Sequence, residues 1–326
     1  LLKLNFSCSF FESEIMRLTG KQIDLSEMYS VRHTYSNKAW NYVMRQGKAQ
    51  FSQGGLGHDV TNSMAENGIV PNSIYSGLKD GEEKHNHSKL ADSLKTILNA
   101  YLKDTKNYSS NWMDDVSEVL DYYLGPDITS FKYEGVQYTP QSFLEMAKII
   151  PEDYLTITSF THQPYYSNFI LNIPDNFSNG TFYNVPLDTM IKVINHALKN
   201  GFSIELDCDV SEKTFSSKHG IAVIPASESQ DALLNVGPEK IITPDYRQQE
   251  FENFNTTDDH LMHITGMLVD QNGTKYYKVK NSWGTDSTRV ARDGYIYMSE
   301  AYMRLKSISV MIHKDAVPQE VQSKLF

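Results

Sequence analysis

The sequence predicts an α+β protein with two lobes, a mainly helical lobe at residues 1–175 and an antiparallel, β-barrel-like lobe at residues 176–326. Apolar residues recur at helical spacing through the first half, which predicts amphipathic helices. Segments rich in β-branched residues, with partial alternation, dominate the second half and predict strands. A chain of 326 residues is long enough to bury one large core or two lobes.

Capping residues and glycines mark the ends of the helices expected in the first half. Asp24 and Glu27 have the spacing of a capping box, in which each side chain satisfies a free backbone N–H group. Gly47 can take the left-handed conformation that ends such a helix. The predicted helices are 9–19, 24–46, a segment capped by Ser88, 112–123 and a segment that starts at Thr139-Pro140.

The second half is expected to contain one helix among strands. The strands are predicted at 154–160, 202–206, 220–224 and 260–269, and the helix at 187–199. Asn272-Gly273 separates two β-rich runs, and this dipeptide is the strongest short-range signal for a hairpin.

Composition excludes several classes of function. The chain has 30 Lys and Arg against 40 Asp and Glu, a formal charge of -10, which argues against a nucleic-acid partner. No apolar run reaches the roughly 18 residues that a membrane span needs. Cys8 and Cys208 are the only cysteines, so no disulfide framework is expected, and the compartment stays open between cytoplasm and export. Because no phosphate-binding glycine loop occurs, we expect no cofactor.

His260 is the first residue that points to a chemistry. If 260–269 is a strand, His260 shares a face with Met262 and Ile264, whereas His263 points the other way. A zinc site would need both imidazoles to converge, which a helix allows and a strand prevents. The strand therefore favours a single catalytic imidazole at His260, with a hydrogen-bonded structural histidine as the other interpretation, and we expect no metal.

Asn281 and Trp283 in the run Asn-Ser-Trp-Gly add a second signal. An imidazole that activates a thiol must be held in one tautomer, and a side-chain amide oxygen such as that of Asn281 can hold it. Trp283 beside the amide would exclude water and strengthen the bond. A turn with a core tryptophan is the alternative interpretation of this run.

Together these segments resemble the papain-like cysteine peptidases, and most closely the aminopeptidase C and bleomycin hydrolase branch. The resemblance extends over most of the chain. It includes Leu25-Ser26-Glu27, the glycine pair in Gln53-Gly54-Gly55, Gly68-Ile69-Val70-Pro71 and Cys208-Asp209-Val210.

The resemblance implies a papain-like fold and hydrolysis of peptide bonds by a Cys-His-Asn mechanism. It makes His260 the base, Asn281 its orienting partner and Trp283 a supporting residue, while the backbone of Gln53-Gly54-Gly55 binds the peptide substrate as an added strand. It also implies a C-terminal tail that restricts cleavage to N-terminal residues and a hexameric ring. The tail of this chain does not clearly match that pattern.

The nucleophile is where the chain departs from the family. The family's cysteine lies ten residues before a glutamate that matches Glu12, which places Leu2 at its position and Lys3 at that of the following tryptophan. The glutamine that completes the oxyanion hole would precede residue 1. Cys8 lies six residues further on, turned by about 240° and displaced by about 9 Å along a helix, so it replaces the nucleophile only if the helix starts near Ser7.

We therefore expect a truncated or inactive relative of an active peptidase. A catalytically dead peptide-binding protein of the same fold is the alternative, and a metal-dependent hydrolase using His260 and His263 is a third hypothesis. Cys8 and Cys208 are expected to be buried thiols. His58-Asp59, after the glycine pair, is expected to cap a helix.

Overall fold

The computed structural model describes residues 2–79, 81–82, 84–227, 231–235, 237–281 and 288–326, with the backbone alone for residues 2–6. This part of the chain divides into two compact units. The helical unit comprises Lys3–Pro151 and Asn172–Gly180, and the sheet unit comprises Glu152–Leu171 and Thr181–Phe326. The domain boundary expected after residue 175 stays a prediction.

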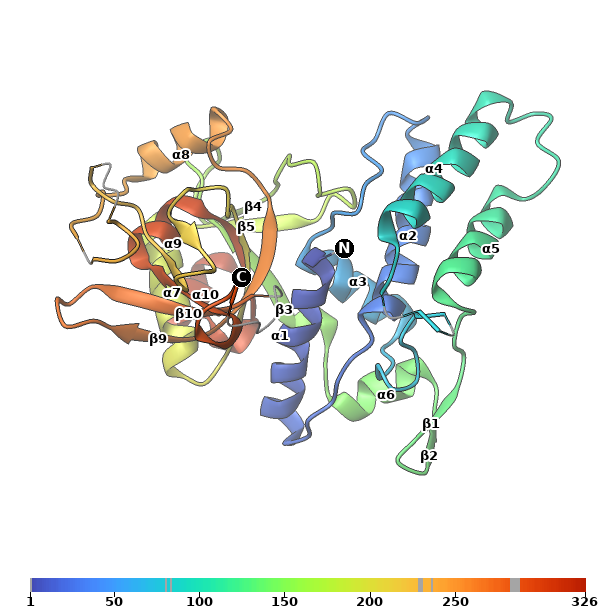
Figure 1. Cartoon of the computed structure of the whole chain (residues 1–326), viewed down its shortest axis with the longest axis horizontal. Helices are drawn as coiled ribbons and strands as arrows, with labels where there is room; N and C mark the ends of the chain where they lie inside the picture. The colour runs from blue at the N-terminus through green and yellow to red at the C-terminus, as the bar shows by residue number, and fades with distance from the viewer. Residues whose placement is uncertain (1, 80, 83, 228–230, 236, 282–287) are drawn as a thin grey trace. The chain divides into compact units, whose positions relative to one another are not determined.

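The helical unit is built on amphipathic helices. In α4, for example, Leu90, Leu94 and Leu98 recur every four residues and are buried, because that spacing places them on one face. Helices α2, α4 and α5 pack against one another (Figure 1). The elements are α1 (Leu2–Thr19), α2 (Glu27–Met44), α3 (Gly57–Asn67), α4 (His87–Lys103), α5 (Trp112–Leu124), β1 (Phe131–Tyr133), β2 (Val136–Tyr138) and α6 (Pro140–Ala147).

Two of the predicted helix caps were wrong by two residues. Helix α2 starts after Ser26, whose Oγ accepts a bond of 3.0 Å from the Tyr29 N–H, whereas Asp24 binds the side chain of Asn72. Helix α4 is capped by Asn86 rather than Ser88. The start of α6 at Thr139-Pro140 is confirmed. A short polar side chain two residues away competes equally well for the same N–H groups, which explains both errors.

The sheet unit contains one sheet in the order β4-β5-β3-β12-β6-β9-β10-β11-β8-β7. The strands are β3 (Tyr154–Thr158), β4 (Ser167–Ile170), β5 (Thr181–Asn184), β6 (Ile204–Cys208), β7 (Phe215–Ser216), β8 (Ile221–Ala222), β9 (His260–Val269), β10 (Lys275–Lys280), β11 (Tyr295–Ser299) and β12 (Ser307–His313). The helices are η1 (Pro151–Asp153), α7 (Leu187–Lys199), α8 (Pro244–Glu252), η2 (Arg292–Gly294), α9 (Glu300–Lys306), η3 (Lys314–Ala316) and α10 (Gln319–Leu325).

The core of this unit lies between the sheet and helix α7. Met190, Ile194 and Ala197 of α7 are fully buried against strand residues such as Leu206 and Ile264. Burying each large side chain stabilises the fold by about 1.5–3 kcal/mol. The predicted helix 187–199 is therefore confirmed, and its apolar face fixes one side of the central strands.

The long hairpin of β9 and β10 is also confirmed (Figure 1). Its turn contains Asn272 and Gly273, and Gly273 has a φ of 85°, which favours glycine. The Asp270 carboxylate accepts bonds from the Asn272 and Thr274 N–H groups. Of the other predicted strands, 202–206 is shifted to Ile204–Cys208 because Gly201 is left-handed and delays its start.

Within the described residues, none of the helices combines the length and the apolar character that crossing a bilayer requires.

Candidate active site

His260 is the first residue of strand β9, in the middle of the sheet. Strand β9 pairs with β6 on one side and β10 on the other, so its backbone is held by two ladders. The β6 residue opposite His260 is Cys208. His260 is 6% exposed, which places its imidazole at the border between the core and solvent.

A β-bulge in the hairpin decides which face Asn281 occupies. Gly266 pairs with Lys278 and Ile264 pairs with Val279, so Thr265 is an extra residue on β9. A shift of one residue moves all later side chains to the opposite face. Asn281, one residue beyond β10, therefore shares the face of Ile264, which is also that of His260.

The two side chains meet in a hydrogen bond of 3.0 Å between His260 Nε2 and Asn281 Oδ1. Because an amide oxygen only accepts, Nε2 carries the proton, and Nδ1 is the nitrogen that can take up another. The Asn281 backbone N–H donates to Gly294 O at 3.0 Å, and this bond fixes the backbone from which the Asn281 side chain projects. Both side chains are 6% exposed, and the low local dielectric strengthens their bond.

The buried Asp209 anchors the segment that leads into His260. Its Oδ2 accepts a bond of 2.7 Å from the Thr257 N–H, and its Oδ1 accepts from the Ser211 N–H and hydroxyl. Asp259 in turn accepts from the Val210 N–H at 3.3 Å. The Cys-Asp-Val segment that resembles the family thus supports the strand that begins with His260, a role that its sequence alone did not reveal.

His263 lies on the other face of β9 and is 1% exposed. Burial lowers the pKa of His263 to about 3, with a smaller contribution from Lys280, so the ring is neutral. Because the segment is a strand, the imidazoles of His260 and His263 do not share a face. The helical conformation that a metal site at this pair needs is not the one adopted.

The glycine loop, Gln53-Gly54-Gly55, belongs to the helical unit. The Lys38 ammonium donates to Ser52 O at 2.9 Å and to Gly54 O, which holds the loop against α2. A Cβ on Gly54 would lie 2.0 Å from a carboxylate oxygen of Asp175, far inside contact distance. Glycine is therefore required at position 54 by the approach of Asp175, whatever else the loop does.

Neither cysteine of the chain is accessible. Cys8 on α1 is 1% exposed and Cys208 is fully buried, as predicted. Burial raises the pKa of the Cys208 thiol, and Asp209 and Asp207 raise it further, so the thiol opposite His260 is not a reactive nucleophile.

Helix α1 includes Leu2, the position at which the sequence resemblance places the family's nucleophile. Glu12, the residue that matches the family's glutamate, accepts a bond of 3.0 Å from the Leu25 N–H. The side chain of Leu2, and the whole of Trp283, lie outside the described residues.

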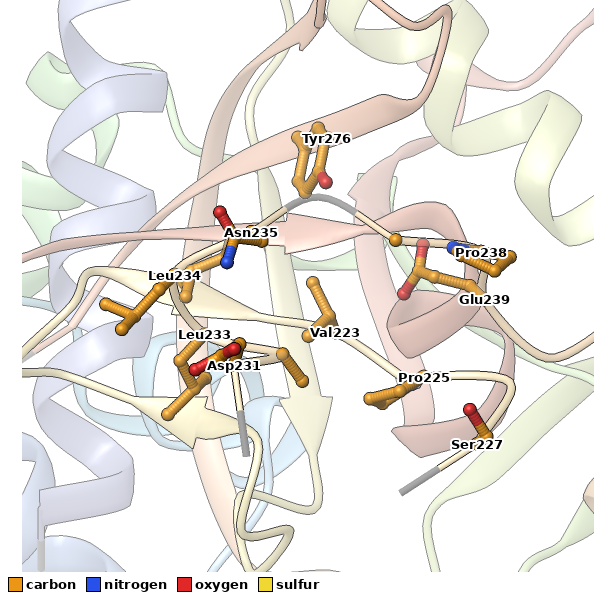
Figure 2. A pocket seen from close by; sticks show the side chains of 13 residues that line it. Val223, Pro225, Ser227, Asp231, Leu233, Leu234, Asn235, Pro238, Glu239 and Tyr276 are labelled. Carbon is orange, nitrogen blue, oxygen red and sulfur yellow. The ribbon is translucent and has the colours of Figure 1, made fainter. Parts of the chain in front are cut away.

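A separate cavity of about 280 Å³ in the sheet unit is lined mainly by apolar residues such as Val223 and Leu234 (Figure 2). Its polar residues include Glu239, whose carboxylate accepts from the Ile224 N–H at 2.7 Å and the Ser299 hydroxyl at 2.6 Å. Neither His260 nor Asn281 lines it. This cavity is therefore distinct from the histidine–asparagine pair.

The crystal structure of pepw from Lactobacillus rhamnosis is similar to this chain over 98% of its residues and 79% of the other chain, with a TM-score of 0.72 and 19% identity. The protein has the α+β, papain-like fold that the sequence predicts. Residues 48–326 match the Peptidase C1-like family. The chain belongs to that family.

Curated relatives agree with this assignment. Aminopeptidase C of Listeria monocytogenes is 25% identical over 296 residues, which are 82% of this chain and 64% of the relative. Aminopeptidase G of Lactobacillus delbrueckii is 21% identical over 87% of this chain and 61% of its own length. The chain thus spans somewhat less than two thirds of these relatives.

Proposed function

We propose that this chain is a cysteine-type peptidase domain of the aminopeptidase kind, in which His260 is the base and Asn281 its orienting partner. The observation that carries the proposal is the 3.0 Å bond between His260 Nε2 and Asn281 Oδ1, formed from neighbouring strands. The names of the relatives support N-terminal peptide residues as substrates. A hexameric assembly is part of the proposal by resemblance only.

The reaction needs a thiol at position 2, as in a Leu2→Cys variant. His260 Nδ1 would take the proton of that thiol, and the dipole of α1 would stabilise the thiolate. The thiolate attacks the substrate carbonyl carbon, and the imidazolium gives its proton to the leaving amine. Water then hydrolyses the acyl-thioenzyme. Trp283 would shield the imidazole–amide bond, and the backbone at Gln53, Gly54 and Gly55 would pair with the substrate.

We further propose that position 2 is the nucleophile position, so that the chain with Leu2 binds peptides without forming an acyl-enzyme. Two observations support this: counting back from Glu12 reaches Leu2, and both existing thiols are buried. A peptide-binding protein without catalysis is thus the alternative function that Leu2 favours.

The test compares the chain with its Leu2→Cys variant, using a peptide-like epoxide that alkylates thiolates. We expect no labelling of the chain with Leu2 and labelling of the variant at position 2. Replacing His260 by Ala in the variant should slow labelling at neutral pH by about a hundredfold, since proton transfer to a positioned base supplies at least that factor. Hydrolysis of aminoacyl-amide substrates is measured in parallel.

Two matched variants control the experiment. Leu2→Ser changes the same position without providing a thiolate and should stay unlabelled, and Cys8→Ser removes the neighbouring thiol and should not affect labelling at position 2. Labelling of Cys8 in the unaltered chain would contradict the assignment of position 2. Labelling of Leu2→Cys that does not depend on His260 would contradict the role of the base.

A further inference from the structure

A second cavity, of about 240 Å³, lies in the helical unit between α2, α3 and the loop at residues 177–179. We call it the α2–α3 cavity. It is larger than a bare ion needs and has room for several waters or the end of a side chain. Its lining is polar apart from two aromatic rings, and consists of Thr34, Asn37, Trp40, Asn41, Asp59, Asn62, Glu66, Phe177, Ser178 and Asn179.

Asp59 is the most unusual residue of this lining. It is 4% exposed, and its Oδ2 accepts a bond of 2.8 Å from the Leu56 N–H, which caps α3 as predicted. None of the described residues makes a geometrically well-formed hydrogen bond to its Oδ1. The ring nitrogen Nε2 of His58 is 3.7 Å from that oxygen, beyond hydrogen-bond range, and is engaged by Ser178 at 3.0 Å. Burial raises the pKa of Asp59, and His58, the Ser178 side chain, the Leu56 N–H and Lys38 partly oppose that rise.

A second buried polar atom lines the same cavity without a partner in the described part of the chain. This atom is Oγ1 of Thr34, on α2, and Thr34 is 3% exposed. Leaving a buried polar atom without a hydrogen bond costs about 1–3 kcal/mol. A ligand that donates hydrogen bonds would satisfy both atoms.

The charges favour a cation as that ligand. Asp59 and Glu66 are the charged residues of the lining, and both are acidic. Trp40 is 54% exposed, and its indole stacks on Trp112 with ring centroids 5.8 Å apart, so it presents a supported aromatic face. Aromatic faces attract ammonium groups.

The walls of the cavity are held in place without a ligand. Asn176 bonds to both the N–H and the carbonyl of Gly180, which closes the loop at 177–179. The ring of His58 packs so close to Gly180 that a Cβ there would lie 2.2 Å from it. Asn37 donates to Glu66 at 3.2 Å and ties α2 to α3.

From this geometry we infer that the α2–α3 cavity binds a primary ammonium group, with Asp59 Oδ1 and the Thr34 hydroxyl as acceptors and Trp40 as the aromatic face. An ammonium has three N–H donors and no acceptor, which matches these groups. The ammonium can belong to a free amine or to a lysine side chain. This site is independent of the proposed peptidase chemistry, since binding is tested on the chain with Leu2.

The experiment titrates the full chain with n-butylammonium and with n-butanol, its neutral counterpart, at constant ionic strength, and follows binding by calorimetry. Saturable binding of the amine in about the millimolar range is expected, with at least tenfold weaker binding of the alcohol. Nα-acetyl-lysine amide and Nα-acetyl-norleucine amide form the second pair. Saturation by the lysine compound assigns the site to side chains as well as to free amines.

Three variants locate the site. Asp59→Asn can keep the bond to the Leu56 N–H while it places an NH₂ group where Oδ1 was, and should weaken amine binding about tenfold or more. Trp40→Leu should weaken it about threefold. Asp92→Asn, which removes an exposed carboxylate of α4 outside the cavity, should leave it unchanged.

Equal binding of n-butylammonium and n-butanol, or no saturable binding by the unaltered chain, would overturn the inference. Unchanged affinity in Asp59→Asn would do the same. If Asp59→Asn does not fold, as judged by circular dichroism, the exposed Glu66→Gln and Trp40→Leu variants decide the question, and unchanged binding in both refutes it.

Discussion

The pair of His260 and Asn281 and the glycine loop are held in place by different means. His260 is the first residue of β9 and Asn281 directly follows β10, and the backbone ladders of these strands to β6 and β11 fix their positions. Residues 53–55 belong to none of the described strands; Lys38 donates to Ser52 O and Gly54 O, and Asp175 lies close against Gly54. A ladder distributes the support over many backbone bonds, whereas the described contacts of the loop come from individual side chains.

Substitutions in the two regions should therefore lower stability in different ways. A substitution in the ladder region should act through lost packing and lower the stability of the sheet unit. A substitution at the loop should act through one specific contact and be reversible by changing its partner.

Ile264→Ala should give the largest loss of stability. Ile264 is fully buried on the same face of β9 as His260, and truncating such a residue typically costs about 2–5 kcal/mol because it leaves a cavity. Urea unfolding measures the change. Val269→Ala, at the 62% exposed end of the same strand, is the control and should cost less than about 0.5 kcal/mol. Equal losses of stability in Ile264→Ala and Val269→Ala would show that the packing of Ile264 does not stabilise the β9 ladder.

His263 should make the sheet unit sensitive to acid. Its pKa is about 3 in the fold against 6.5 for the free side chain, so between these values the unfolded chain binds one more proton. Above about pH 6.5 the ring is neutral in both states, and His263 does not change the free energy of unfolding. Below that pH the free energy of unfolding falls by up to about 1.4 kcal/mol per pH unit as the pH drops toward 3. Unfolding between pH 7 and 4.5 should show a shallower slope in His263→Gln.

The control for this prediction is His196→Gln, a change of the same kind on the partly exposed face of α7. It should leave the pH slope as it is. If the slope in His263→Gln equals that of the unaltered chain, burial of His263 is not linked to acid sensitivity.

Gly54→Ala should cost about 1–3 kcal/mol, because the new Cβ displaces the buried Asp175 carboxylate. The double variant Gly54→Ala/Asp175→Ala should lose less stability than the sum of the single changes, as thermal unfolding can measure. Strict additivity would rule out the contact as the cause. Such a result would also leave substrate binding as the better reason for glycine at this position.

Gln53→Ala should have the smallest effect on stability, within about 0.5 kcal/mol. Its side-chain bond to the Ser88 hydroxyl, 3.2 Å long, is exposed to solvent. In the Leu2→Cys background, hydrolysis of aminoacyl-amide substrates by the Gln53→Ala variant tests separately whether the loop contributes to substrate binding. A loss of unfolding free energy several times larger than about 0.5 kcal/mol would show that the Gln53 side chain also stabilises the loop.

The regular parts of the fold could be predicted because their signals are local. Alternation along 260–269 and the Asn-Gly turn identify the hairpin, and the apolar face of 187–199 identifies α7. The bond between His260 and Asn281 agrees with the roles that the family resemblance implies for them.

The remaining features depend on residues far apart in the sequence. Asp175 is 121 positions from Gly54, and Asp209 is 48 positions from Thr257, so no local pattern reveals either contact. The bulge at Thr265, which determines which histidine Asn281 meets, has a local signal in the neighbouring Gly266, since an isolated glycine in a strand can mark a bulge. Helix caps were misplaced where two polar residues compete, as at Asp24 and Ser26.

The position of that bulge has a consequence for engineering. The hairpin tip, residues 266–278, lies beyond Thr265. Insertions at the tip therefore leave Ile264 paired with Val279. Asn281 then stays on the same side of the sheet. The tip at Asn272-Gly273 is therefore a suitable place to insert an affinity tag or a reporter peptide. Removing Thr265 alone would join Ile264 to Gly266 and keep both of their pairings, so it would change the face of the hairpin tip and leave Asn281 on the side of His260.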